Sequence, residues 1–182
     1  MTVLDPDRPD LGGNIRHGDS HTHCPVLWQY LIDRFAIRSM LDVGCGEGHA
    51  VDWFNRHGVY AVGIDGLPLN IERAVHPIIR HDLKRCPFDM PVDLVWSCEV
   101  AEHIDEQYVD NYLNTLACGT IVAMTHAVPG QGGYHHVNEQ PAEYWITEMK
   151  RRGYELHPDT AYGRHVEPAR TYFGQTGLIF TR

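Results

Sequence analysis

The chain of 182 residues is long enough to bury one hydrophobic core and short for two, so we expect a single domain over residues 1–182. Its formal net charge of −9 disfavours a broad nucleic-acid interface, which usually needs a basic face. No apolar run approaches the roughly 18 residues of a membrane span, and neither a secretory signal nor a C-x-x-C pair is present. We therefore expect a cytoplasmic protein without disulfides, and the sequence does not indicate its oligomeric state.

Residues 1–26 are polar, rich in glycine and proline, and carry three histidines, so we expect little regular structure there. His21, His23 and Cys24 could bind a metal, but no second ligand pair lies nearby, and a segment without metal is the preferred interpretation. The apolar residues between 27 and 35 have helical spacing. We expect this helix to face the core, and a contact of Trp28 with a substrate cavity stays open as an alternative.

A first strand ending at Val43 runs into a glycine turn with the spacing G-x-G-x-G, followed by a helix that ends at Gly58. Glycine permits positive φ and lets a ligand approach bare backbone, while helix-start amides favour a negatively charged or accepting group. A second strand ends at Asp65, 17 residues after Gly48. A carboxylate at that position can accept both hydroxyls of a ribose. The pattern predicts a nucleotide-type cofactor site in an open α/β sheet.

Three further strands are predicted over 77–83, 93–100 and 119–126, with a helix whose apolar face runs from Tyr108 to Leu116. A loop over 127–140 contains three glycines and two adjacent histidines and exceeds the usual strand-to-helix length of about 2–6 residues. Such a loop at the end of a central strand indicates function. Pro141 is expected to start a helix that ends at Gly153, and short strands are expected over 154–157 and 177–181, separated by a polar and aromatic span.

With its glycine turn in Leu41–Gly48 and the acid-ended strand in Val62–Leu67, the sequence resembles the class I S-adenosylmethionine-dependent methyltransferases from about Ser39 to its end. The resemblance implies a Rossmann-like, seven-stranded, mostly parallel sheet with helices on both faces and an antiparallel C-terminal strand. It implies S-adenosyl-L-methionine as cofactor and residues 1–26 as a lid. The cofactor-binding residues expected are Asp42, Gly44, Cys45, Gly46, Gly48, Asp65, Gly66, Leu67, His81, Asp82, Leu83, Cys98, Glu99 and Val100.

Two positions are specified further by the resemblance. Asp82 would contact the adenine amino group, with Leu83 against the ring. Glu99 with Glu102-His103 looks like the motif that follows strand four in small-molecule methyltransferases, whose substrates lie against this exit. The Asn/Asp-Pro-Pro-Tyr-like sequence of amino-methylating nucleic-acid enzymes is replaced by residues 97–100. We therefore expect a small-molecule or glycan acceptor, with neither nucleic acid nor membrane as partner.

Methyl transfer to a hydroxyl requires removal of its proton, and histidine, with a pKa near neutrality, suits that role. His126 is the first candidate base because it ends a strand, and His103 and His136 follow. An amine acceptor would need no base. No metal ligand is assigned, although a divalent cation held by His136, Asn138 and Glu139 is an alternative.

Two other classes of function remain open from the sequence. A nicotinamide-dependent oxidoreductase would also use an acid at the end of the second strand. The glycine spacing weighs against it, because dinucleotide enzymes carry G-x-G-x-x-G. A non-catalytic S-adenosylmethionine-binding protein would keep the cofactor site without turnover, and the intact turn and polar strand exit argue against such decay.

Overall fold

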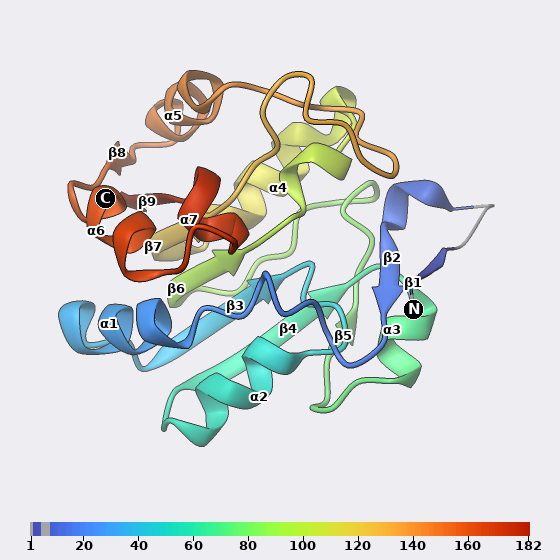
Figure 1. Cartoon of the computed structure of the whole chain (residues 1–182), viewed down its shortest axis with the longest axis horizontal. Coiled ribbons are helices and arrows are strands. Elements are labelled where there is room, and N and C mark those ends of the chain that lie inside the picture. Colours follow the sequence, from blue (N-terminus) through green and yellow to red (C-terminus); the bar gives the residue numbers. More distant parts are fainter. Residues whose placement is uncertain (1, 5–7) are drawn as a thin grey trace.

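A seven-stranded sheet forms the centre of the computed structural model, which describes residues 2–4 and 8–182 (Figure 1). Only β9 runs antiparallel to its neighbours in that sheet. The strands lie in the order β5 (Ile79–Arg80), β4 (Tyr60–Asp65), β3 (Ser39–Val43), β6 (Val92–Ser97), β7 (Gly119–Met124), β9 (Leu178–Thr181) and β8 (Glu155–Leu156). The strand order reverses between β3 and β6, so their carboxyl ends open a crevice. The predicted fold class is confirmed.

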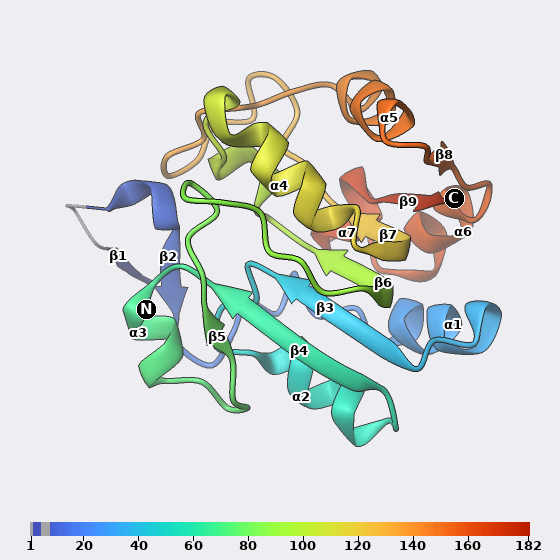
Figure 2. The same ribbon diagram turned by 180° about the vertical axis from the view of Figure 1, so that it is seen from behind.

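Helices cover both faces of the sheet, with α1 and α2 on one side and α4 and α5 on the other (Figures 1 and 2). Period-two alternation along β7 explains the two cores, because Ile121 and Ala123 face one and Val122 and Met124 face the other. The helices are α1 (Pro25–Phe35), α2 (His49–Arg56), α3 (Pro68–Glu72), α4 (Val109–Leu116), α5 (Ala142–Arg151), α6 (Asp159–Val166) and α7 (Tyr172–Thr176), with short turns η1 (Pro9–Leu11), η2 (Ala101–His103) and η3 (Glu106–Tyr108).

The N-terminal segment is more regular than its composition predicts. β1 (Thr2–Leu4) and β2 (Gly13–Ile15) form an antiparallel pair beside the carboxyl end of the main sheet, which corrects the expectation of little regular structure (Figure 1). The signal was missed because each strand has only three residues. Side-chain contacts of Asn14 with distant parts of the chain hold the second strand in place.

Further along the chain, three elements differ from the expectation. The third predicted strand shrinks to Ile79–Arg80, and α5 begins at Ala142 with Pro141 as its N-cap rather than its first residue. The span between β8 and β9 contains α6 and α7. In α6 only Thr160 and Gly163 are buried, so the helix has no apolar periodicity to detect. Among the described residues, no helix is both long and apolar enough to cross a membrane.

The amino ends of β3 and β6 are joined by one carboxylate. Asp93 Oδ2 accepts hydrogen bonds from Arg38 N at 2.8 Å, Ser39 N at 2.9 Å and Ser39 Oγ at 3.1 Å. We expect Asp93→Ala to lower the free energy of unfolding by about 1–3 kcal/mol, because these donors lose an ionised acceptor. Urea unfolding, with the exposed Glu72→Ala as control, measures the difference. Equal midpoints for the two variants would contradict this role of Asp93.

Candidate functional site

A cavity of about 1100 Å³ lies at the carboxyl ends of the central strands, where the strand order reverses. The glycine turn after β3 and the acid at the end of β4 line one part of it. The exit of β6 and the loop over 127–140 line another, and the N-terminal segment covers it. One continuous cavity therefore touches both the turn predicted for a cofactor and the exit predicted for an acceptor.

The glycine turn presents bare backbone to this cavity. Gly44 and Gly46 have φ of +73° and +55°, which side chains rarely adopt. A Cβ on Gly44 would lie 2.3 Å from Val100 Cγ2, so the turn packs tightly against the exit of β6. A Cβ on Gly46 would meet nothing within 4 Å and would fill space that a ligand could use. The turn thus fits a ligand that approaches the main chain closely.

Asp65 joins the turns that follow β3 and β4. Its carboxylate accepts from Gly46 N at 2.9 Å, Leu67 N at 2.8 Å and Asn70 Nδ2 at 2.9 Å, and it lines the cavity. Burial raises the pKa of Asp65 to about 6 even though these three donors oppose the shift. The side chain therefore shapes the turn and presents an acceptor to the cavity.

The N-terminal segment is fixed over the cavity by polar contacts. Arg8 Nη2 lies 2.8 Å from Asp82 Oδ2, and Lys84 Nζ lies 3.1 Å from Asp10 Oδ2. Asn14 donates to Glu47 Oε1 at 2.9 Å, within the glycine turn itself. These contacts hold residues of the N-terminal segment against the cavity.

A cluster of acidic and imidazole groups lies at the exit of β6. Glu99 has a φ of +60°, which is strained for a residue with a side chain, and its Oε1 accepts from Thr125 Oγ1 at 3.1 Å. Glu102 on η2 is fully buried, and burial raises the pKa of both carboxyls. Burial also lowers the pKa of His103 to about 4, so this imidazole is neutral at physiological pH. His136 comes from the long loop, and its ring lies 5.1 Å from that of His103 between centroids.

Most residues expected at the site line this cavity. His103 and His136 do so, as do twelve of the predicted cofactor residues: Asp42, Gly44, Cys45, Gly46, Asp65, Gly66, His81, Asp82, Leu83, Cys98, Glu99 and Val100. Gly48 and Leu67 lie outside the lining; they act on it through the backbone, Gly48 as the N-cap of α2 and Leu67 as a donor to Asp65.

His126 does not reach the cavity, which corrects its first rank among the candidate bases. Its ring is 2% exposed and lies outside the lining. Its backbone N donates to Thr176 Oγ1 at 3.4 Å, on the side of α7. The preceding residue, Thr125, turns toward Glu99, and successive side chains of an extended segment point to opposite sides.

Several lining residues were not selected from the sequence. Glu47 lies inside the glycine turn, and its position between Gly46 and Gly48 could have marked it as a lining residue. Trp28 reaches the cavity while packing in the core, which was the alternative for this residue. Asp19 and Tyr172 line the cavity through long-range packing, for which the sequence carries no local signal, and His23, considered above only as a metal ligand, lines it too.

The sequence and fold match known proteins. A family model described as a methyltransferase domain matches residues 41–120. Phosphoethanolamine N-methyltransferase 1 of Zea mays is 27% identical over 147 residues, which cover 72% of this chain and 28% of that protein. The chain thus spans less than a third of this relative's length.

Three solved structures share the fold. The TehB-like S-adenosylmethionine-dependent methyltransferase of Corynebacterium glutamicum has a TM-score of 0.63 at 22% identity and covers 84% of this chain and 85% of its own. The sugar N-methyltransferase KedS8 of Streptoalloteichus sp. has a TM-score of 0.67 at 16% identity, covering 92% and 89%. Small RNA methyltransferase HEN1 has a TM-score of 0.56 at 14% identity, covering 86% of this chain and 25% of its own. At these identities the likeness shows the fold alone.

Together with the glycine turn and the acid-ended β4, these matches show a methyltransferase domain over residues 41–120 and the fold of S-adenosylmethionine-dependent methyltransferases. S-adenosylmethionine is the cofactor that such a domain uses.

Asp42, on β3 below the glycine turn, gives a pH-dependent prediction. Burial, with the nearby Asp65 charge, raises its pKa to about 8, against about 3.9 in an unfolded chain. Between these values the folded protein keeps a proton that the unfolded chain has lost, so stability falls as pH rises. The substitution Asp42→Asn removes this pH-dependent loss of stability. We expect its Tm to exceed that of the wild type by more at pH 8 than at pH 5, and a pH-independent difference would contradict the assignment.

Proposed function

We propose that this protein transfers the methyl group of S-adenosylmethionine to a small polar acceptor bound in the same cavity. The observation that carries the proposal is the continuity of one 1100 Å³ space from the glycine turn to the cluster at the exit of β6. Methyl transfer requires donor and acceptor to be held in line, and a shared cavity supports this positioning.

In this proposal the cofactor lies against the glycine turn and Asp65, which line one part of the cavity. Gly44 and Gly46 would take the amino-acid portion against the main chain, and Asp65 would accept the ribose hydroxyls. Asp82 would accept from the adenine amino group, although it also accepts from Arg8. The cofactor supplies an electrophilic methyl group, and the protein's part is to hold and orient the reactants.

The acceptor end favours a hydroxyl oxygen. The neutral imidazole of His103 can accept a hydroxyl proton, which is the role first expected of His126, and His136 lines the same part of the cavity. The acidic balance of the chain supports a small acceptor rather than a nucleic acid.

An amine acceptor is the second candidate. It is favoured by two names among the similar proteins, a phosphoethanolamine N-methyltransferase and a sugar N-methyltransferase. Asp19 and Glu99, which both line the cavity, could attract an ammonium group. In that case a base would be needed only to release the free amine.

Cofactor binding tests the donor end. We expect isothermal titration to give one S-adenosylmethionine site per chain and Asp65→Ala to weaken it about 10- to 100-fold, because charged hydrogen bonds and the turn geometry are lost together. Asp33→Ala, exposed on α1, is the matched control. Binding of a reduced nicotinamide cofactor in place of S-adenosylmethionine would refute the assignment.

Turnover tests the acceptor end. With labelled S-adenosylmethionine, a panel of catechols, sugars, amino sugars, ethanolamine derivatives and RNA should give label transfer to one small-molecule class. For a hydroxyl acceptor, His136→Ala should lower kcat by about 10²- to 10⁴-fold, whereas His126→Ala should change it only a few-fold. Labelled RNA with no labelled small molecule, or no turnover despite tight cofactor binding, would overturn the proposal.

A further inference from the structure

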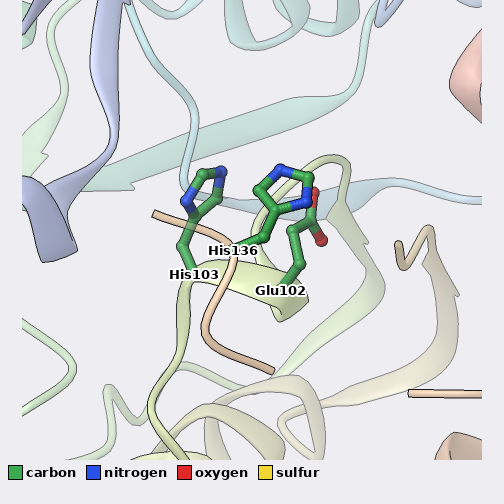
Figure 3. A group of neighbouring side chains, drawn as sticks. All are labelled: Glu102, His103 and His136. Atoms are coloured by element: carbon green, nitrogen blue, oxygen red, sulfur yellow. The ribbon is translucent and has the colours of Figure 1, made fainter. Parts of the chain in front are cut away.

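We propose that Glu102, His103 and His136 form a binding site for a divalent transition-metal ion at the acceptor end of the cavity. One ligand atom of each residue lies within 4.8 Å of the other two. Figure 3 shows the carboxylate of Glu102 and the two imidazole rings turned toward one another, two from η2 and one from the loop over 127–140. His103 and His136 also line the cavity.

Glu102 is the strongest indication of a missing partner. Its side chain is fully buried, and neither carboxylate oxygen has a hydrogen-bond partner among residues 2–4 and 8–182. A buried carboxylate without donors is costly in any protonation state, because its desolvation is not offset. A cation bound to these oxygens would offset that cost directly.

His136 has a carboxylate partner of the kind that metal-bound histidines usually have. Its Nδ1 lies 3.2 Å from Glu139 Oε1, so Nε2 is the ring nitrogen that remains for an ion. Glu139 is itself fixed by the backbone amides of Gly130 and Gly132, at 2.7 and 2.6 Å. A carboxylate behind a ligating imidazole fixes the tautomer and the ring direction, and such outer partners are a common part of metal sites.

His103 completes the set. Its Nδ1 is buried and has no hydrogen-bond partner in the described part of the chain, and its ring packs edge-to-face on that of His136. The loop that carries His136 is joined to η2, because the backbone amides of Val137 and Asn138 donate to Glu102 O at 2.9 and 3.1 Å. The three ligands are thus held together by the backbone as well as by their side chains.

The donor set specifies the kind of ion. Two imidazoles and one carboxylate suit Mn²⁺, Fe²⁺, Co²⁺ or Zn²⁺ and are a poor match for Ca²⁺ or Mg²⁺, which prefer oxygen. Three protein ligands leave coordination positions open toward the cavity. On the proposed function, an acceptor oxygen would occupy one of these positions and ionise more readily, with His103 and His136 acting as ligands rather than bases.

Metal binding can be measured without cofactor or acceptor. Chelator-treated protein is titrated with Co²⁺, and its visible absorption and calorimetric heat are followed. We expect one site per chain, with at least a tenfold loss of affinity in His136→Gln and in Glu102→Gln. Glu139→Gln should bind about 10- to 100-fold more weakly, as expected for an outer partner.

The neighbouring His135 provides the matched control. It lies on the same loop with a φ of +52°, which asparagine tolerates, so His135→Asn tests nonspecific binding by loop histidines. Thermal melts check whether each variant is folded. If Glu102→Gln is unfolded, His136→Gln, on the loop, still tests the site. The proposal is overturned if the wild type shows no Co²⁺ site, or if His135→Asn loses affinity as His136→Gln does. The methyltransferase proposal survives that result, because turnover by metal-free enzyme would return His103 and His136 to the role of bases.

Discussion

The carboxylate of Asp65 is the constraint on which the glycine-turn side of the cavity depends. The turn after β3 and the turn after β4 come from separate βα units, yet Gly46 N and Leu67 N both donate to this one side chain. Gly44 N and Cys45 N add bonds to Ile64 O, one residue earlier on β4. Buried amides without acceptors are costly, so the two turns are stable mainly in this joint arrangement. The positive φ of Gly44 and Gly46 follows from the same geometry.

Much of the sheet was predictable because strand signals are local. The alternation along β7 and the glycine turn beside an acid-ended strand can be seen in short windows, and they predicted the sheet correctly. His126 shows where local reasoning fails. Proximity to a strand end does not decide which side a residue faces; here the bond between Thr125 and Glu99 decides it.

The covering segment illustrates a second limit. Arg8 pairs with Asp82, and Asn14 bonds Glu47 and Asn70, at separations of 74, 33 and 56 residues. Such contacts leave no periodicity in the sequence, and each participating residue is typical of a solvated loop. The polar composition of the segment concealed a hairpin that depends on the domain beneath it.

The exit of β6 combines two energetic costs that a purely structural turn would avoid. Glu99 holds a φ of +60°, and Glu102, three residues later, buries a carboxylate without a hydrogen-bond partner in the part of the chain that the structure describes. Strain and desolvation of this kind persist where the surrounding structure fixes them, and they concentrate at functional sites. The loop over 127–140 is also constrained by the position of a side chain. A Cβ on Gly133 would lie 2.3 Å from His136 Nε2, so only glycine leaves room for the imidazole there. The glycine content of this loop therefore positions a histidine, in addition to allowing the chain to turn.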